Sequence, residues 1–212
     1  MFTGIITQQA LVKNRIESES DMRFSFELHD DYLDSCRIGD SIAVSGVCLT
    51  IVELNDDGFS ADVSLETLNR TTIGQWQNGH VVNLELALKA ADRLGGHLVS
   101  GHIDACATLA SATVQAGSSR MEFEYPFELA RYVPEKGSVC IDGVSLTVNE
   151  VSGEVSGEVS GNNDDRNWFC VNVIPHTLGR TSLGGLRAGA RVNLEIDMIA
   201  RYLERLVPEK HQ

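Results

Sequence analysis

The sequence has 212 residues, and its 30 acidic and 17 basic side chains give a net charge of −13. A chain of this length accommodates two domains of about 100 residues each. The acidic balance argues against binding to nucleic acid or to an anionic membrane surface. No apolar run reaches the roughly 18 residues of a membrane span, and the first residues do not read as a secretion signal. We therefore expect a soluble, cytoplasmic protein.

In chain order, the sequence predicts short strands separated by turns. The predicted segments are two strands in residues 1–28 joined by a polar turn at 17–21, a helical turn at 30–36, strands at 41–50, 59–64 and 81–88, a hairpin turn at 55–58, and turns at 67–72 and 75–79. The second half repeats this order, with residues 126–132 in the place of the helical turn. Many short strands with frequent turn signals indicate antiparallel barrels or sandwiches.

One stretch at the centre of this pattern occurs twice, as SIAVSGVCLT at 41–50 and as SVCIDGVSLT at 138–147. Each copy alternates apolar with small or polar residues, as a half-buried strand does. The glycine inside each strand, Gly46 or Gly143, predicts a bulge or a close approach of the backbone to another group. Cys48 and Ser145 occupy the same position in the two copies, which predicts two similar pockets with unequal roles.

The repeat continues downstream, where residues 66–74 match residues 176–184. The offset between the copies grows from 97 to 110 residues, so the second copy carries 13 more residues. They fall in a Gly/Ser/Asp-rich run near residues 151–165, which we expect to be an exposed loop. Two copies are too few for a solenoid, which needs at least about three. The predicted division is a first domain at 1–97, a second domain at 98–196 and a C-terminal segment at 197–212.

The C-terminal segment has no counterpart at the end of the first copy. Residues 197–207 predict a helix, with Asp197 near its start and Pro208 after its end. Its apolar side chains lie on one face at helical spacing, namely Met198, Ile199, Tyr202, Leu203 and Leu206. This helix either packs on one of the domains or provides an oligomer contact, and the sequence leaves both open.

The cysteines and histidines give no sign of a disulfide framework or a metal site. The five cysteines are an odd number without C-x-x-C spacing, as expected in a reducing compartment. None of the six histidines belongs to an H-E-x-x-H motif. His97 and His102 lie five residues apart with Gly101 between them, which is poor ligand spacing on a strand or a helix. No metal is predicted.

Five motifs in this order resemble the riboflavin synthase family of the alpha-chain type. They are MFTGII at 1–6, SGVCLT at 45–50, GGHLVSGH at 95–102, DGVSLT at 142–147 and IPHTL at 174–178. The resemblance covers residues 1–207 and includes the internal duplication. Two departures are the long loop at 151–165 and Ser45, where many relatives have asparagine.

The resemblance implies an all-β fold of two tandem, similar six-stranded antiparallel Greek-key barrels plus a C-terminal α-helix. It also implies a homotrimer with the helix at its centre, in which the first barrel of one subunit faces the second barrel of its neighbour. The implied reaction is a dismutation, in which two molecules of 6,7-dimethyl-8-ribityllumazine exchange a four-carbon unit to give riboflavin and 5-amino-6-(ribitylamino)uracil. No cofactor is implied, and lumazine synthase is a further candidate partner.

A flat, uncharged heteroaromatic ring with a polyol tail needs a pocket of backbone amides and hydroxyls. By resemblance, the first pocket consists of Gly4, Ile5, Ile6, Cys48, Leu49, Thr50, Asp62, Val63, Ser64, Leu65, Glu66 and Thr67. The second consists of Gly101, His102, Ile103, Lys136, Ser145, Leu146, Thr147, Asn172, Val173, Ile174, Pro175, His176 and Thr177. The hydroxyls of Thr50 and Thr147 are suited to fix the ring edge, although threonine is also common on any strand surface.

The reaction needs a proton removed from the C7 methyl of one lumazine and a nucleophile added at C7 of the other. His102 is the candidate proton shuttle, with a structural histidine as the alternative. Cys48 is the candidate for addition or hydrogen bonding at C7, with a small buried side chain as the alternative. The catalytic set is completed by Ser145 and Ser41, which deliver a water or hydroxyl, and by Thr147.

Two other functions stay open at this point. A lumazine- or flavin-binding protein without catalysis would keep the same fold, but the retention of Cys48 and His102 argues against it. A hydrolase triad would consist of Ser145, His102 and Asp104, but the sequence lacks the G-x-S-x-G elbow. The two readings differ in outcome, because one predicts binding without turnover and the other predicts ester hydrolysis.

Overall fold

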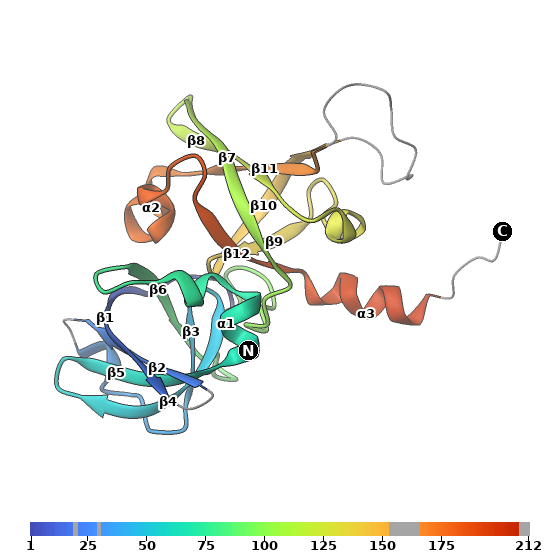
Figure 1. The fold of residues 1–212 in the computed structure, drawn as a ribbon. Helices are drawn as coiled ribbons and strands as arrows, with labels where there is room; N and C mark the ends of the chain where they lie inside the picture. The colour runs from blue at the N-terminus through green and yellow to red at the C-terminus, as the bar shows by residue number, and fades with distance from the viewer. Residues whose placement is uncertain (19–20, 29–30, 153–165, 208–212) are drawn as a thin grey trace.

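The computed structural model describes residues 1–18, 21–28, 31–152 and 166–207 as two β-barrels followed by a helix (Figure 1). The first barrel is closed and antiparallel, with the strand order β1-β2-β5-β4-β3-β6. Its strands are β1 (Gln8–Ser18), β2 (Asp21–Glu27), β3 (Ser41–Val44), β4 (Val47–Asn55), β5 (Gly58–Ser64) and β6 (Val81–Leu86). The predicted hairpin turn at 55–58 is confirmed. The centre of the turn predicted at 17–21 lies outside the described residues, and the strands on either side of it pair with each other.

The second barrel repeats this architecture, with the strand order β10-β11-β8-β7-β12-β9. Its strands are β7 (Ala105–Gln115), β8 (Ser118–Glu124), β9 (Ser138–Ile141), β10 (Val144–Val151), β11 (Trp168–Val173) and β12 (Arg191–Ile196). The all-β fold with two six-stranded barrels is confirmed, and the sandwich alternative is wrong. The long loop predicted at 151–165 falls almost wholly outside the described residues.

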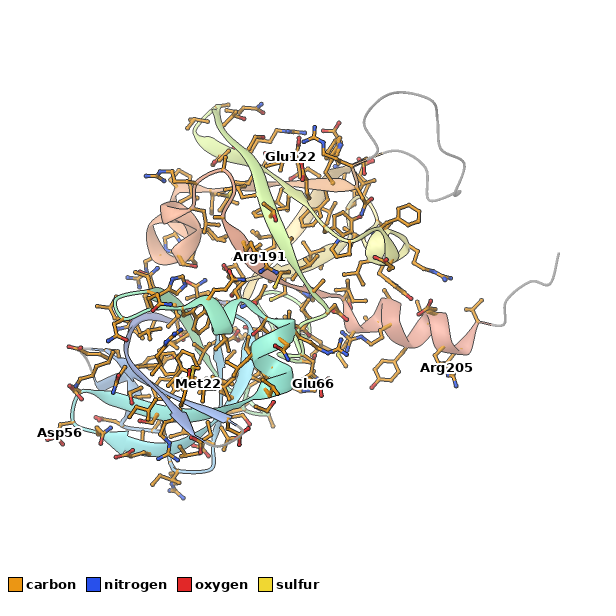
Figure 2. All side chains as sticks on the ribbon, viewed as in Figure 1. Met22, Asp56, Glu66, Glu122, Arg191 and Arg205 are labelled. Atoms are coloured by element: carbon orange, nitrogen blue, oxygen red, sulfur yellow. The ribbon has the colours of Figure 1, made fainter. Side chains whose placement is uncertain are left out.

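Each barrel has its own hydrophobic core, and side chains fill both interiors (Figure 2). Phe26 stacks on Phe59 in the first core, with ring centroids 4.9 Å apart, and Phe123 stacks on Phe169 in the second, at 5.7 Å. Strand alternation explains this burial, because every second residue of β2, β5 and β8 points inward. The two barrels are therefore separate packing units.

Short helices confirm the helical turns predicted within 30–36 and 126–132, and they also replace other predicted turns. They are η1 (Asp31–Leu33), α1 (Leu65–Arg70), η2 (Thr72–Gln75), η3 (Phe127–Tyr132), α2 (Pro175–Arg180) and η4 (Ser182–Gly185). Ser64 caps α1 by accepting a hydrogen bond from the Thr67 amide, and the Thr71 side chain caps η2 in the same way. The turn prediction for 67–72 was wrong because two closely spaced caps stabilise helical turns there.

The repeated central stretch is a hairpin rather than one bulged strand. β3 and β4 are joined by Ser45 and Gly46 at φ 42° and 83°, and β9 and β10 by Asp142 and Gly143 at φ 45° and 82°. Two successive residues with positive φ form the turn that suits a two-residue hairpin. The predicted close approach is confirmed, because a Cβ on Gly46 would lie 2.8 Å from the Gly143 nitrogen. The two turns thus meet back to back between the barrels.

Replacing Gly46 by alanine is expected to destabilise the protein more than replacing Gly79. Both glycines have a positive φ, 83° and 85°, where a side chain costs about 1–2 kcal/mol. Only Gly46 has backbone within 3 Å of its missing Cβ, whereas nothing lies within 4 Å at Gly79. We expect the clash to add about 1–3 kcal/mol to the loss in unfolding free energy. Equal losses in denaturant titrations of the two variants would contradict the back-to-back packing.

Two buried asparagines, Asn83 on β6 and Asn193 on β12, connect the barrels crosswise. The Asn83 amide donates to the Asp142 carbonyl at 2.8 Å and accepts from the Ser182 amide at 2.7 Å. The Asn193 amide donates to the Ser45 carbonyl at 2.9 Å and accepts from the Thr72 amide at 2.7 Å. Each asparagine therefore binds a turn carbonyl and a 3₁₀-helix amide of the opposite barrel. The domain boundary at residue 97 itself stays a prediction.

The carboxyl group of Asp142 is buried at this junction and accepts a hydrogen bond from the backbone N–H of Asn193 at 2.8 Å. Burial raises the pKa of Asp142 to about 7, and the hydrogen bond acts in the opposite direction. Because the folded pKa exceeds that of the unfolded chain, the stability due to this group is full below about pH 4 and is lost as pH rises through 7.

We therefore expect the unfolding free energy of the wild type to fall relative to that of Asp142→Asn between pH 4 and pH 8. The asparagine keeps the acceptor oxygen but does not ionise, so all other titrating groups cancel in the comparison. Urea titrations of both proteins at several pH values provide the measurement. Parallel pH profiles of the two proteins would contradict the prediction.

The C-terminal helix α3 (Met198–Leu206) extends away from both barrels (Figure 1). Asp197 caps it by accepting from the Ile199 amide at 2.9 Å, as predicted from the sequence. Ion pairs join Arg201 to Asp104 and Glu204 to Arg131. Its apolar face is exposed, at Ile199, Tyr202, Leu203 and Leu206. This face packs on neither barrel, and no helix among the described residues is long and apolar enough to cross a bilayer.

Candidate active site

The predicted site residues on β4 and β5 divide between the core and the outer wall of the first barrel. Leu49 and Val63 are buried in the core, so that only their backbone is available to a ligand. Cys48, Thr50 and Asp62 alternate with core residues and point outward. The outward-facing groups thus form one wall of thiol, hydroxyl and carboxylate functions.

β10 and β11 build the corresponding wall on the second barrel. Ser145, Thr147 and Asn172 face outward, whereas Val173 is fully buried and Leu146 packs against the core. The following residues 174–177 begin α2, as residues 65–67 begin α1 in the first barrel. The two walls are therefore structurally equivalent and chemically different.

Loops near the start of each repeat cross to the opposite barrel. Phe2 and Val99 pair as an antiparallel bridge between the barrels. Beyond it, the Gly101 carbonyl accepts from the Cys48 amide of the first barrel at 2.9 Å. The Gly4 carbonyl accepts from the Ser145 amide of the second barrel at 2.8 Å.

The predicted grouping of these loops is therefore wrong. Residues 4–6 were expected beside Cys48 and residues 101–103 beside Ser145, and the structure exchanges them. The side chains follow the same exchange, because Ile6 packs on the second core and Ile103 on the first. A repeated sequence predicts that this loop contacts this strand. It does not predict whether the two belong to the same copy of the repeat or to different copies.

The crossing defines two groups of residues that we call half-sites. The Cys48 half-site comprises Ser41, Cys48, Leu49, Thr50, residues 62–67 and residues 101–103. The Ser145 half-site comprises residues 4–6, Ser145, Leu146, Thr147 and residues 172–177. Ser41 belongs to the first group because it is the cross-strand partner of Thr50. His102 also moves to this group, although the sequence placed it with Ser145.

Lys136 is the one predicted ligand residue that we assign to neither half-site. It lies in the loop before β9 with a positive φ of 65°, and its amide donates to the Val148 carbonyl. Its ammonium group pairs with the neighbouring Glu135 at 3.7 Å. The backbone of Lys136 therefore binds the middle of β10, and nothing in these contacts directs its side chain to Ser145.

Both half-sites are open walls in the single chain. Thr50, Thr147, His102 and His176 are all exposed. One hollow of about 460 Å³ adjoins the Cys48 half-site at Asp62, and it is lined by Ile16, Glu17, Asp21, Arg23 and Asp62. A ligand on either wall would therefore keep one face uncovered by this chain.

His97 is a site residue that the sequence analysis missed. Its Nδ1 lies 2.8 Å from the Ser145 hydroxyl, and its backbone amide donates to the Thr3 carbonyl at 3.2 Å. Burial lowers the pKa of His97, and the charge of Asp197 opposes this shift. His97 is thus a neutral acceptor or donor for the Ser145 hydroxyl near neutral pH. The motif at 95–102 contains His97, but its two histidines were compared only as metal ligands, and His102 alone was named as a proton shuttle.

The hydrolase triad is contradicted by these contacts. The Asp104 carboxylate accepts from Arg201 at 2.8 Å and from the Ile196 amide at 2.9 Å. The ring partner of Ser145 is His97, whereas His102 lies on the loop that crosses to Cys48. Serine, histidine and aspartate of the proposed triad therefore belong to different local networks.

The half-sites also differ in charge. Arg23 and Asp62 face each other on β2 and β5 and form two hydrogen bonds, at 2.6 and 2.8 Å. The bond from Arg23 lowers the pKa of Asp62. In the second barrel the cross-strand pair is Arg120 and Asn172, and the guanidinium of Arg120 instead reaches Glu150 at 2.9 Å. An anionic group is therefore replaced by a neutral amide between the two walls.

No three histidine, cysteine or acidic side chains gather as metal ligands within the part of the chain that the structure describes. Cys36, Cys48, Cys106, Cys140 and Cys170 are all free thiols. Among these, Cys140 is buried between the barrels beside Phe2 and Val99. The half-sites contain thiol, hydroxyl, imidazole and carboxylate groups, which can form hydrogen bonds and transfer protons.

Known proteins share this architecture. The lumazine binding domain family matches the chain twice, over residues 3–87 and 100–197. Riboflavin synthase of Mycobacterium bovis is 42% identical over 208 residues, covering 98% of both chains. That of Escherichia coli is 39% identical over 198 residues, covering 93% of this chain and 87% of the other. A crystal structure of LumP complexed with 6,7-dimethyl-8-(1'-D-ribityl) lumazine has a TM-score of 0.78 at 26% identity, covering 92% of this chain and 99% of LumP. The chain therefore belongs to the lumazine-binding family and, within it, to the riboflavin synthases.

Proposed function

We propose that the protein catalyses the dismutation of 6,7-dimethyl-8-ribityllumazine to riboflavin and 5-amino-6-(ribitylamino)uracil. The observation that carries the proposal is the pair of equivalent walls that differ at their nucleophilic position, Cys48 against Ser145. A reaction between two identical molecules needs two similar binding places, and transfer from one to the other needs unequal chemistry there. Holding both rings in the reactive orientation supplies a large part of such an acceleration.

Each half-site is proposed to hold one lumazine through backbone groups and hydroxyls. Thr50 and Thr147 are proposed to contact the ring edges on the two walls, together with residues 62–67 and 172–177. The exposed apolar side chains Leu65 and Ile174 are suited to contact a flat ring. Since the substrate is uncharged, no basic cluster is needed in either place.

The proposed chemistry divides between the two walls. Cys48 adds to C7 of the lumazine in its half-site or hydrogen-bonds at that carbon, and Ser41 supplies a hydroxyl nearby. Because His102 lies on the same wall as Cys48, we assign it the C7 methyl proton of the other lumazine, which faces this wall from the Ser145 half-site. Ser145, hydrogen-bonded to His97, delivers a hydroxyl or water in the other half-site, with Thr147 assisting. The transferred unit carries four carbons, and the two products together contain the atoms of both substrates.

The protein is proposed to act as a homotrimer in the cytoplasm. The exposed apolar face of α3 supports an association of subunits through this helix. An open Cys48 wall on one subunit facing the open Ser145 wall of its neighbour would cover both faces of each bound ring. Lumazine synthase, which makes the substrate, is the proposed further partner, whereas the acidic charge disfavours nucleic acid and membranes.

A binding protein without turnover is the alternative, because structures of LumP in complex with the lumazine and with riboflavin share this fold. The identity to LumP is 26%, whereas the identity to riboflavin synthases reaches 42%. Mixing the purified protein with the lumazine alone separates the two functions. Riboflavin at half the molar amount of lumazine consumed, without added cofactor, is expected. Tight binding without riboflavin would overturn the proposed reaction.

A further inference from the structure

A buried carboxylate holds the loop that crosses to Ser145. Glu85 on β6 is 5% exposed and belongs to the first barrel. Its Oε1 accepts from both the amide and the hydroxyl of Thr3, each at 2.6 Å, and its Oε2 accepts from the Gly4 amide at 2.9 Å. The carboxylate accepts all three hydrogen bonds, and both of its oxygens are needed as acceptors.

Glu195 on β12 repeats this arrangement for the loop that crosses to Cys48. It is 1% exposed, and its Oε1 accepts from the Ser100 amide at 2.7 Å and from the Ser100 hydroxyl at 2.5 Å. Its Oε2 accepts from the Gly101 amide at 2.9 Å. The two copies thus share the carboxylate, the hydroxyl residue and the glycine, in the same order.

The loops held in this way make very close contacts with the half-sites. A Cβ on Gly101 would lie 2.6 Å from the Cys48 Cβ, and one on Gly4 would lie 2.6 Å from the Ser145 Cβ. Both glycines have a positive φ, 82° and 74°. The backbone therefore approaches the two functional side chains as closely as glycine permits, and small loop movements displace them directly.

Burial raises the pKa of Glu85, and the hydrogen bonds from Thr3 and Gly4 act to lower it. Burial likewise raises the pKa of Glu195, against hydrogen bonds from Ser100 and Gly101. The mechanism described above uses neither carboxylate. Each buried carboxylate accepts three hydrogen bonds from one crossing loop and takes no part in the proposed chemistry. These contacts indicate that it holds the loop in position.

We propose that Glu85 and Glu195 are positioning residues, each of which sets the geometry of one half-site through the loop that it holds. Glu195 positions the backbone against Cys48, and Glu85 positions the backbone against Ser145. Each carboxylate therefore acts on the half-site of the opposite barrel. The consequence for turnover rests on the proposed function, whereas the effect on the two half-sites does not.

The exchange of glutamate for glutamine separates this role from simple filling of space. Whichever way the amide is turned, its NH₂ group faces a backbone N–H, of Ser100 or of Gly101 in the case of Glu195. One hydrogen bond is lost and two donors are opposed, so the loop is pushed away from Cys48. The side chain keeps its size, and the barrel core is unchanged.

The first measurement is the rate at which iodoacetamide alkylates Cys48 in the unliganded protein, followed by peptide mass spectrometry. Because access controls thiol reactivity, Glu195→Gln is expected to accelerate the reaction about fivefold, and Glu85→Gln is expected to leave it unchanged. Cys36, which packs against the first core, serves as the internal reference. Exposed Glu128 provides the matched control, Glu128→Gln.

The reciprocal measurement uses Ser145→Cys as the background. There, Glu85→Gln is expected to accelerate alkylation at position 145, and Glu195→Gln is expected to leave it unchanged. If either glutamine variant fails to fold, Ser100→Ala and Thr3→Ala each remove only one hydrogen bond from the same carboxylates and serve in its place. Equal acceleration at both positions by one variant would overturn the proposal, since it indicates general loosening.

Turnover of 6,7-dimethyl-8-ribityllumazine completes the test. Misplacement by about 1 Å costs about 100-fold in rate, so both glutamine variants are expected to lower kcat by about 10- to 100-fold. Selective alkylation with unchanged kcat would overturn the positioning role in the reaction. If the wild type makes no riboflavin, the proposed function fails, and the alkylation pattern still decides whether the carboxylates position the loops.

Discussion

Replacing Cys48 by alanine is expected to lower the turnover of 6,7-dimethyl-8-ribityllumazine by about 100-fold or more, a loss typical of a group that acts in the chemical step. Cys48 lies on the outer wall of β4, half-buried, with its amide bound to the Gly101 carbonyl at 2.9 Å. Removing only the sulfur leaves this backbone contact and the neighbouring Thr50 in place. The dissociation constant for lumazine is therefore expected to change by less than about threefold.

Single-turnover kinetics and fluorescence titration of the same preparation measure the two quantities. Cys36→Ala is the matched control, because Cys36 is also a half-buried free thiol of the first barrel and lies outside both half-sites. It is expected to keep wild-type turnover. Equal losses of turnover and lumazine affinity in Cys48→Ala would remove this residue from the chemical step and leave it a binding contact.

Replacing Asn193 by leucine is expected to lower the unfolding free energy by about 2–6 kcal/mol, because each buried group left without a partner costs about 1–3 kcal/mol. Asn193 is fully buried and holds the Thr72 amide and the Ser45 carbonyl of the other barrel. Leucine is similar in size but satisfies neither group, and water has no access to this junction between two packed cores.

Thermal unfolding provides the measurement. In a chain of this size 1 kcal/mol corresponds to about 2–4 °C, so the melting temperature is expected to fall by roughly 10 °C. Asn14→Leu is the control, since Asn14 is exposed at an irregularity of β1 and its loss is expected to cost less than about 0.5 kcal/mol. A melting temperature equal to that of the control would show that the crosswise hydrogen bonds do not stabilise the contact between the barrels.

Local patterns were sufficient to predict two antiparallel β-domains, and the family resemblance then predicted that both domains are barrels. Alternation along residues 59–64 and the hairpin turn at 55–58 correspond to β5 and its connection to β4. The repeated sequence then placed the same elements in the second half. The hairpin at Ser45 and Gly46 was missed because a glycine inside an alternating run also fits a bulge. The Asp142–Gly143 pair in the other copy is the stronger hairpin signal, and comparing the two would have corrected the first.

The outward-facing residues of each wall were predictable, but the loop that meets each wall was not. Outward positions such as Thr50 and Thr147 follow from strand alternation. The partner of each loop depends on the path of the chain between the barrels, and repeats of equal sequence are equally compatible with either path. The contact of His97 with Ser145 joins residues 48 positions apart through such a crossing. No periodicity within either copy encodes it.

The crossing of the loops also constrains the history of this fold. A single ancestral barrel would have carried one loop and one hairpin, but its own loop would not have reached its own hairpin. Two such chains would satisfy each other by exchanging loops, as Gly4 and Gly101 do here. Joining two such copies in one chain would preserve this exchange of loops. Because the two copies occupy different segments of one chain, a mutation can change one wall and leave the other unchanged. The two binding surfaces can therefore differ in one atom, the sulfur of Cys48 against the oxygen of Ser145.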